Sequence, residues 1–400
     1  MSSSVFEIEG FSFSAVSAGI KRADSDRLDF GLIVSDSPAV TVGVTTTNIV
    51  CAAPVTITRE RLQTGVSQVI LVNSGNANAY TGCQGVANAL SLTTAVASAM
   101  TVDENLVIPM STGVIGLPLP VDRMKFRVPE LVGSLSRSGF DKVASAIMTT
   151  DTQPKTACVD RTLSNGPLRI VGMAKGAGMI APNMATMLAV ILVDVLVERS
   201  FLSEVFVQIN NVTFNRVTID GDTSTNDTAI VMSGGCRQPR KLLDNVDDRN
   251  TFSQALFTVC QSLSRQIVQD GEGATKVVEI SVLGAPDDNS ATRIARRIAE
   301  SPLVKTAFHG EDPNWGRIVC AAGSAGVSFD PAQLDLWIGD VQIVRSGVLE
   351  SGDWENRAKQ VMQNREFSVV LDLNAGPSKA SILTCDLSEE YVGINADYRS

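Results

Sequence analysis

Residues 178–195 read GMIAPNMATMLAVILVDV, and this stretch joins two kinds of sequence. Its first half contains Gly178, Pro182 and Asn183, which are typical of a turn. Its second half, residues 187–193, is a run of apolar side chains that predicts a buried strand. Thr186 stands at the junction. The stretch therefore predicts a loop that runs directly into the core of a sheet, with a hydroxyl side chain where the two meet.

Strand-like and helical segments alternate before this junction. The apolar run 68–72 predicts a buried strand, and after the loop NSGNANAYTG the apolar residues of 86–100 recur at helical spacing. The run 106–109 predicts another strand, which ends in the turn STGVIG at 111–116. Each of these strands therefore leads into a polar, glycine-containing turn.

The rest of the chain continues the alternation. Apolar residues at helical spacing predict helices over 252–267 and 290–300, with Ser290 as the N-cap of the second. The segments 334–344 and 367–387 each predict two strands around a turn. The mixture predicts an α/β fold with α+β layers, in which sheets pack against helices.

Length and composition limit the class of protein. A chain of 400 residues suffices for two domains or for one large α/β domain with a well-filled core. A hydrophobic share of 44% with 19% charged residues indicates an ordered globular protein. The net charge of −10 and the lack of a clustered Lys/Arg surface argue against a nucleic-acid partner.

Cysteine usage and the terminal sequence bear on the compartment. The seven cysteines are widely spaced without a C-x-x-C pair, which predicts reduced, mostly buried thiols. The N-terminal MSSSVFEIEGF lacks the basic and apolar regions of a secretory signal. The longest apolar run is broken by Asp194 before it could span a bilayer. We therefore expect a cytoplasmic location and no membrane partner.

Several common chemistries are excluded or disfavoured. His309 is the only histidine, so a histidine-based triad would have to use it, and a site with several histidine ligands is excluded. Its polar, glycine-rich surroundings predict a loop histidine with a structural hydrogen bond. The segment GEGATK at 271–276 does not have the spacing of a phosphate loop. Asp220 and Asp222 could bind a metal, but a solvated Asp/Gly turn is favoured, so no metal is expected.

Hydroxyl chemistry without a histidine base remains. A threonine hydroxyl becomes a nucleophile when an adjacent group takes its proton, and the residue's own α-amine does so once the chain is cut just before it. An α-amine has a pKa of roughly 7.7–8.0, so it is partly neutral near physiological pH. The small Ala185 and the flexible Gly176 and Gly178 suit a strained turn before Thr186. A threonine that merely begins a strand is the commoner alternative.

The motifs resemble those of a known family. KGAGMIAPNMATML, NSGNANAYTG, STGVIG, TTDTQPK, TIDGDTSTND, GEGATK, GEDPNWGRI and the terminal INADYRS follow one another along the chain. In this order they resemble the ornithine acetyltransferases, also called glutamate N-acetyltransferases, of arginine biosynthesis. The resemblance covers nearly the whole chain.

The resemblance implies a self-cleaved acetyltransferase of the N-terminal-nucleophile type. Cleavage between Ala185 and Thr186 would give an α chain (1–185) and a β chain (186–400), which stay together as an α2β2 heterotetramer. Thr186 would then carry an acetyl group from N-acetylornithine to glutamate. Some members also accept acetyl-CoA as a donor, and no other cofactor is implied.

The resemblance also assigns roles to individual residues. Thr112 and Gly113 match the oxyanion hole, which agrees with the ability of a strand ending in a glycine turn to aim donors at one oxygen; an ordinary turn with Gly113 at positive φ is the alternative. At Ser400 this chain departs from the more usual threonine. The matched substrate-binding residues are Thr149 (beside Thr150 and Thr152), Lys175, Thr186, Glu272, Asn395 and Ser400.

A lysine and a glutamate suit amino-acid substrates, which present a carboxylate to one and an ammonium to the other. Solvated surface charges are the alternative interpretation of Lys175 and Glu272. Asp312, Asn314, Trp315 and Arg317 of DPNWGR are given only a structural role.

Two other functions remain open at this point. A self-processed amidase or aminopeptidase would share the nucleophile and the oxyanion hole but pass the acyl group to water. A non-catalytic amino-acid-binding protein would keep the pocket without cleaving.

Overall fold

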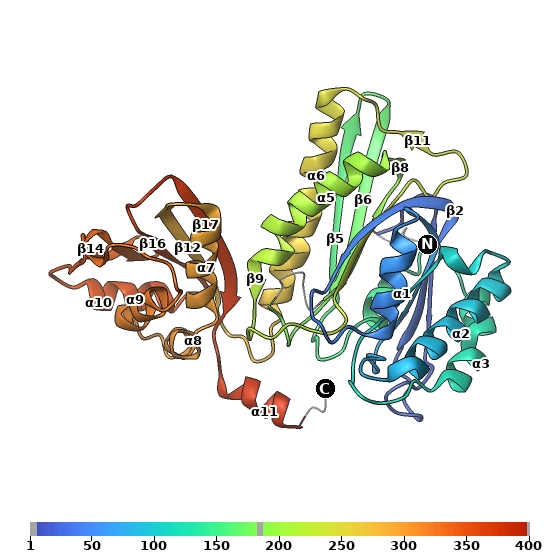
Figure 1. The fold of residues 1–400 in the computed structure, drawn as a ribbon, viewed down its shortest axis with the longest axis horizontal. Coiled ribbons are helices and arrows are strands. Elements are labelled where there is room, and N and C mark those ends of the chain that lie inside the picture. The colour runs from blue at the N-terminus through green and yellow to red at the C-terminus, as the bar shows by residue number, and fades with distance from the viewer. Residues whose placement is uncertain (1–5, 182–186, 398–400) are drawn as a thin grey trace. The chain divides into compact units, whose positions relative to one another are not determined.

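The structure is a computed structural model that describes residues 6–181 and 187–397. The predicted cleavage residues Ala185 and Thr186 and the predicted substrate residue Ser400 lie outside the described residues. The chain divides into two compact units (Figure 1). Among the described residues, one comprises the chain up to Asn215 together with Asp222–Ile267, and the other comprises Arg216–Gly221 and the chain from Val268 to Asp397.

The first unit is built on one eight-stranded sheet. Its strands lie in the order β4-β3-β2-β10-β7-β6-β5, and β1 pairs with β2. A two-stranded pair, β8 with β11, lies apart from it. The bounds are β1 (Phe11–Val16), β2 (Phe30–Thr45), β3 (Val66–Asn73), β4 (Val107–Ser111), β5 (Lys155–Leu163), β6 (Gly166–Lys175), β7 (Leu188–Val193), β8 (Val195–Leu196), β10 (Thr228–Ser233) and β11 (Arg240–Lys241).

Strand β7 is the apolar run that the sequence predicts just after Thr186. All six of its side chains are buried. It pairs antiparallel with β6 and parallel with β10, so both of its edges are hydrogen-bonded. Both of its faces are covered as well. Val190 belongs to the core that includes helix α4. Ile191 pairs with Gly172, where a Cβ would lie only 2.8–2.9 Å from Val259 and Leu263 of α6. A strand covered on both faces is apolar throughout, because neither face meets water.

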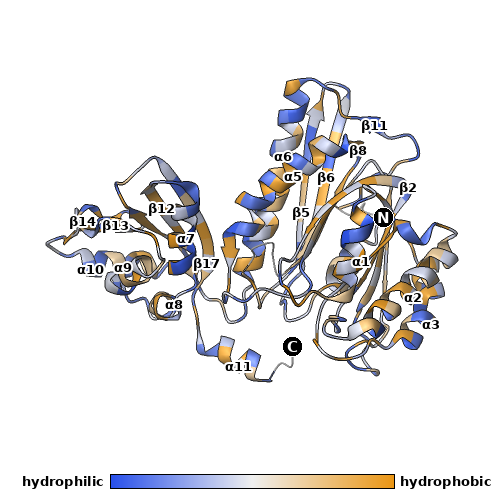
Figure 2. Ribbon diagram, in the orientation of Figure 1, coloured by the Kyte–Doolittle hydropathy of each residue, from blue (hydrophilic) through white to orange (hydrophobic). Residues whose placement is uncertain are grey.

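Helices cover the faces of this sheet (Figure 1). Residues of α2 and α3 pack with one set of side chains from β1, β2, β3 and β4, while α4 packs with the set on the opposite face. Figure 2 shows the strands of this sheet as apolar over much of their length. The bounds are α1 (Ala53–Leu62), α2 (Gly82–Met100), η1 (Glu104–Leu106), α3 (Val121–Gly133), α4 (Phe140–Ala146), α5 (Arg199–Val212) and α6 (Val246–Gln269).

The second unit has its own sheet and core. Seven strands lie in the order β15-β14-β13-β16-β12-β17-β9. Apolar residues of β12, β16 and β17 form one buried cluster with those of α7, α8 and α9. The bounds are η2 (Phe214–Arg216), β9 (Val217–Thr218), β12 (Val277–Ala285), α7 (Asp288–Ala299), α8 (Pro302–His309), α9 (Trp315–Gly323), η3 (Pro331–Gln333), β13 (Asp335–Ile338), β14 (Val341–Arg345), β15 (Val348–Leu349), α10 (Trp354–Met362), β16 (Glu366–Asp372), β17 (Ser378–Cys385) and α11 (Glu389–Asp397).

The α/β prediction, with sheets packed against helices, is confirmed. Every strand and helix that the periodicity predicts is present. One cap prediction is wrong: Asp287, not Ser290, caps α7, because the Asp287 carboxylate accepts the N–H of Ser290 at 2.8 Å. His309 was expected in a loop but is the last residue of α8. The predicted α chain (1–185) and β chain (186–400) are products of cleavage rather than compact units, and they stay predictions.

Two predictions about the whole chain, the burial of most cysteines and the absence of a membrane-spanning segment, can be compared with the described residues. Cys236, Cys260 and Cys385 are buried, whereas Cys83 and Cys320 are exposed, so the burial predicted for most thiols holds for three of them. Among the helices of the described residues, none combines the length and apolar character needed to cross a bilayer.

Candidate active site

An asparagine-rich loop holds the predicted oxyanion turn. The loop starts at the end of β3 and the turn starts at the end of β4, and these parallel strands pair Asn73 with Ser111. The Ser111 hydroxyl donates to Asn73 Oδ1 at 2.7 Å, and Asn73 Nδ2 donates to the carbonyl oxygen of Asn76 at 2.9 Å. The motifs NSGNANAYTG and STGVIG therefore form one local structure at the ends of two neighbouring strands.

The turn itself requires glycine at position 113. Gly113 has φ +130°, and a Cβ there would lie 2.4 Å from the carbonyl carbon of Gly75 and 2.5 Å from the nitrogen of Asn76. The Thr112 N–H donates to the carbonyl oxygen of Asn73 at 3.0 Å, so it is already engaged. The Thr112 hydroxyl has no hydrogen-bond partner within residues 6–181 and 187–397. The hydroxyl, rather than the backbone N–H, is the donor that Thr112 can offer to a substrate oxygen.

A buried cluster of charges surrounds Lys175 at the end of β6. Lys155, at the start of β5, donates to Asp151 Oδ1 at 2.6 Å, and Lys175 Nζ lies 3.8 Å from Asp151 Oδ2. The exposed fractions of Lys155 and Lys175 are 0% and 6%. The N–H of Gly176 also donates to Asp151 Oδ1, at 2.6 Å. Asp151 thus joins the strand ends to the backbone that leads toward the predicted cleavage point.

The electrostatics of this cluster favour an ionised Asp151. Burial acts to raise the pKa of its carboxyl, but the ammonium groups of Lys175 and Lys155 outweigh burial and hold the pKa well below its ordinary value. Lys155 and Lys175 share this carboxylate, so the buried ammonium group of Lys175 is held at the end of β6. Such an arrangement favours the approach of an anion, such as the carboxylate of an amino acid.

Thr149 belongs to the same cluster. Its N–H donates to Asp151 Oδ2 at 2.8 Å, and its hydroxyl lies 3.4 Å from the same oxygen. The structure therefore brings Thr149 and Lys175 together through Asp151, which the sequence did not single out. The spacing of Asp151 and Lys155, four residues apart in TTDTQPK, is the signal that could have found this ion pair.

The segment before β10 connects the oxyanion turn to the start of β7. Asn226 Nδ2 donates to the carbonyl oxygens of Ser111, at 2.8 Å, and Ala77, at 2.6 Å. Two residues later, the Thr228 N–H donates to the carbonyl oxygen of Met187 at 2.9 Å. Met187 follows Thr186 directly in the sequence. One short segment therefore contacts both the turn and the residue next to the predicted nucleophile.

The second unit brings two predicted substrate residues together. Asn395 Nδ2 of α11 donates to Glu272 Oε2 at 2.7 Å, and Glu272 is only 8% exposed. The loop that carries Glu272 packs against the chain before α11, because the Ser388 hydroxyl donates to the carbonyl oxygen of Gly273 at 2.7 Å. The alternative interpretation of Lys175 and Glu272 as solvated surface charges is wrong for both.

The last two residues of GEGATK, Thr275 and Lys276, are bound by the carboxylate of Asp386. Asp386 accepts the N–H groups of Thr275 and Lys276, each at 2.8 Å. His309 Nδ1 lies 2.7 Å from the same carboxyl group, which confirms the structural hydrogen bond predicted for this histidine. Burial acts to raise the pKa of Asp386, but these hydrogen bonds lower it below its ordinary value. The backbone N–H groups of Thr275 and Lys276 are therefore already engaged and are not available to bind a phosphate.

Two further predictions concern metals and DPNWGR. Asp220 accepts a hydrogen bond from the Tyr391 hydroxyl at 3.2 Å, and the described residues contain no group of three or more His, Cys, Asp or Glu side chains that could hold a metal ion. In DPNWGR, Asn314 caps α9 by accepting the Arg317 N–H, and Trp315 packs against the core of the second unit. These contacts agree with the structural role expected for that motif.

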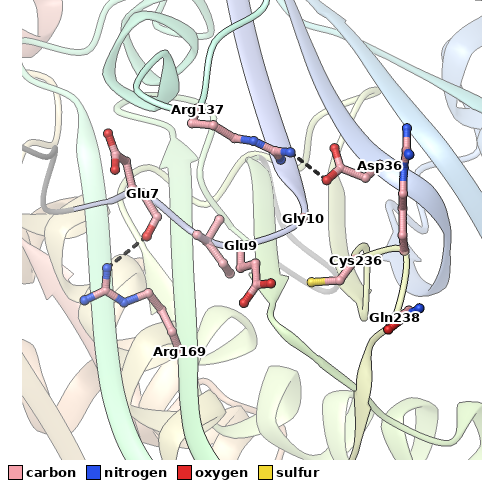
Figure 3. Close-up of a pocket in the computed structure, with 10 residues that line it drawn as sticks. Glu7, Glu9, Gly10, Asp36, Arg137, Arg169, Cys236 and Gln238 are labelled. Carbon is pink, nitrogen blue, oxygen red and sulfur yellow. Dashed lines mark hydrogen bonds and ion pairs between the residues drawn. The ribbon is translucent and has the colours of Figure 1, made fainter.

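A cavity of about 840 Å³ lies elsewhere in the first unit (Figure 3). Among the residues that line it, Arg137 forms an ion pair with Asp36 at 2.6 Å, and Arg169 donates to the carbonyl oxygen of Glu7 at 2.9 Å. None of the predicted site residues lines it.

Three features together define the class of an acyl-transfer enzyme. They are the Thr112–Gly113 turn with its hydroxyl donor, the buried ammonium of Lys175 near Thr149, and strand β7, which starts two residues after Thr186. The comparisons agree with this class. Residues 12–400 match the ArgJ family. The chain belongs to the ArgJ family and is an acetyltransferase of arginine biosynthesis, which confirms the resemblance and favours transfer over the amidase or aminopeptidase alternative.

One curated relative is similar over nearly the whole chain, and two solved structures are similar over about half of it. The arginine biosynthesis bifunctional protein ArgJ of Geobacter sulfurreducens is 47% identical over 98% of this chain and 100% of its own. A crystal structure of the bifunctional protein from Bacillus halodurans is 37% identical, covering 51% of this chain and 96% of its own with a TM-score of 0.48. The ornithine acetyltransferase of Mycobacterium tuberculosis, complexed with ornithine, is 37% identical, covering 45% of this chain and 95% of its own with a TM-score of 0.41.

Proposed function

We propose that this protein transfers an acetyl group from N-acetylornithine to glutamate through an acetyl ester on Thr186. The products are ornithine and N-acetylglutamate, and acetyl-CoA serves as a second acetyl donor. A relative bound to ornithine and relatives named as bifunctional support these substrates. The observation that carries the proposal is the single segment that contacts both Ser111, the residue before Thr112, and Met187, the residue after Thr186.

The reaction begins with a cut between Ala185 and Thr186, which frees the Thr186 α-amine. The neutral amine takes the proton of the Thr186 hydroxyl as its oxygen attacks the acetyl carbonyl. The Thr112 hydroxyl and the Gly113 N–H stabilise the negative oxygen that forms. The intermediate collapses, the leaving amino group of ornithine takes the proton, and the acetyl group stays on Thr186. The amino group of glutamate then attacks this ester, and the same steps run in reverse.

The sheet supports an α chain and a β chain that stay together after the cut. Strand β7 of the proposed β chain pairs with β6 of the proposed α chain over Ile170–Lys175 and Leu188–Val193. Strand β10 of the β chain pairs with β2 of the α chain. Ala185 and Thr186 lie between the end of β6 and the start of β7 in the sequence, so a cut between them removes none of the hydrogen bonds of these strands. The α2β2 assembly, the absence of a cofactor other than acetyl-CoA as substrate, and the cytoplasmic location stay predictions.

The amino-acid substrates share an α-carboxylate, so one set of contacts serves donor and acceptor in turn. Lys175 binds the carboxylate in this proposal, and the Asp151 cluster supports that role because it holds the ammonium in a buried place. Thr149, Glu272, Asn395 and Ser400 complete the substrate contacts. The hydrogen bond between Asn395 and Glu272 supports a joint role for these two side chains.

The Thr112 hydroxyl is expected to act on the chemical step. Removing one oxyanion donor typically costs about 2.7–4 kcal/mol of transition-state stabilisation. Thr112→Ala should therefore lower kcat about a hundredfold or more while KM changes little, whereas Thr112→Ser should restore most of the rate. Steady-state kinetics of the processed variants test this. A rise in KM with an unchanged kcat would make Thr112 a binding residue.

The acetyl-enzyme predicts ping-pong kinetics, because ornithine leaves before glutamate enters. Initial rates against N-acetylornithine at several glutamate concentrations should give parallel lines. Mass spectrometry after donor alone should find the acetyl group on the peptide that begins at Thr186, and a parallel reaction with labelled acetyl-CoA tests the second donor. Intersecting lines with an unmodified Thr186 peptide would contradict the covalent route.

Glu272→Gln should weaken the use of both amino acids and leave self-cleavage intact.

A further inference from the structure

Two neighbouring residues outside the assigned site contact both halves of the proposed acyl-transfer machinery. Asn226 donates its two amide hydrogen bonds to Ser111, next to the oxyanion turn, and to Ala77. Asp227 accepts the backbone N–H of Met187 on its carboxyl group. Because Thr228 N–H binds the Met187 carbonyl oxygen at 2.9 Å, Met187 is held through both its N–H and its C=O.

Bond lengths alone place this contact close to the proposed nucleophile. Three covalent bonds, with a summed length of about 4.3 Å, separate the Met187 nitrogen from the α-nitrogen of the preceding residue. A shift of Met187 is therefore passed directly to the α-amine that self-cleavage would expose. On the other side, Ser111 precedes Thr112 directly, so a shift of Ser111 is passed to the oxyanion turn in the same way.

The burial of this pair makes the contacts strong. Asn226 and Asp227 are 5% and 2% exposed. Asp227 Oδ2 has no hydrogen-bond partner among the described residues. Burial raises the pKa of the Asp227 carboxyl well above its ordinary value, although the hydrogen bond from Met187, the charge of Lys175 and the hydrogen bonds from the side chains of Ser224 and Thr46 act to lower it.

Resting on the function proposed above, we propose that Asn226 and Asp227 are positioning residues that fix the Thr112–Gly113 turn and the start of β7 relative to each other. They act through Ser111 and Met187 and do not touch the substrate. In the proposed reaction Thr186 attacks the carbonyl carbon of the acetyl group, and the Thr112–Gly113 turn stabilises the carbonyl oxygen. A change in the separation of the two therefore lowers the rate of the chemical step more than it weakens substrate binding.

Substitutions at Asp227 test this role with a matched control. Asp227→Ala removes the acceptor of the Met187 N–H, and Asp227→Asn keeps an acceptor oxygen of the same size without a charge. Asp194 is the control: it follows β7 at the opposite end and accepts the Arg169 N–H at 2.9 Å, and burial also raises the pKa of its carboxyl. Loss of one such hydrogen bond should slow the reaction about tenfold.

The measurements are the rate of self-cleavage of the full chain, kcat and KM of the processed enzyme, and the thermal midpoint. Asp227→Ala should slow self-cleavage and lower kcat about tenfold, while KM stays within about twofold. Asp227→Asn should restore the self-cleavage rate and kcat. Asp194→Ala should change neither the self-cleavage rate nor kcat. Should Asp227→Ala not fold, Asn226→Asp replaces the two amide donors with an acceptor and should lower kcat in the same way.

Two results overturn the inference. One is an Asp227→Ala variant that cleaves and turns over at the wild-type rate. The other is an Asp227→Asn variant that is as slow as Asp227→Ala, which would assign the effect to a titrating carboxyl and not to the hydrogen bond. Failure of the proposed function looks different, because the wild-type protein would then lack a chain beginning at Thr186 or an acetyl group on it.

Discussion

Thr186→Ala is expected to remain a single chain of 400 residues with no transferase activity. The same hydroxyl is proposed to attack the preceding peptide bond during self-cleavage and the acetyl carbonyl during turnover, so its removal stops both reactions. A denaturing gel after prolonged incubation and an assay of labelled acetyl transfer from N-acetylornithine to glutamate measure the two effects.

Controls separate the loss of the hydroxyl from a loss of the fold. Thr186→Ser keeps a hydroxyl and should still cleave to some degree, while Thr162→Ala, at an exposed position of β5, should cleave fully. N-terminal sequencing of the smaller wild-type chain should begin TMLAVIL. A start at any other residue, or normal cleavage of Thr186→Ala, would refute the assignment of the nucleophile.

Segments whose burial is visible in local pattern were predictable from the sequence. The run after Thr186 has only apolar side chains, and the structure surrounds β7 with a strand on each edge and a packed layer on each face. Strand β2 was not predicted, although it is the longest strand described in the first sheet. Polar residues at Ser35, Asp36 and Ser37 interrupt its pattern, and its pairing with β3 shifts register between Val34 and Ala39. A bulge of this kind breaks the period of two on which the prediction depends.

The site residues divide in the same way. Lys175 and Glu272 were found because they lie in recognisable motifs, but their burial depends on partners far away in the sequence. Asp151 meets Lys175 across 24 positions, and Asp227 meets Met187 across 40. Within the motif TIDGDTSTND, the sequence pattern singles out Asp220 and Asp222 as a turn, whereas Asp227 is the carboxylate that contacts the start of β7. Composition and spacing do not predict pairing between β7 and β10, and that pairing brings Asp227 to Met187.

Asp151→Asn is expected to destabilise the first unit by about 3–5 kcal/mol, because breaking a buried ion pair leaves uncompensated charge in the interior. Lys155 and Lys175 would both lose the carboxylate charge that they share, and the new amide group would meet the N–H of Thr149, which now donates to Asp151 Oδ2. Urea unfolding in the Thr186→Ala background keeps every variant a single chain. The control is Asp160→Asn on strand β5, which breaks the exposed ion pair with Arg169 of β6 and should cost less than about 1 kcal/mol.

The pH dependence gives an independent check on the charge of Asp151. Its pKa in the folded protein lies below the unfolded value of about 3.9, so the stability that it contributes is complete above that value. This contribution is lost as the pH falls below about 3.9 toward the lower, folded-state pKa. The difference in unfolding free energy between wild type and Asp151→Asn should therefore be constant near neutral pH and shrink in acid. A difference that stays the same down to pH values well below 3.9 would mean that the side chain stabilises the fold through its hydrogen bonds alone, and that Lys155 and Lys175 are balanced by other groups.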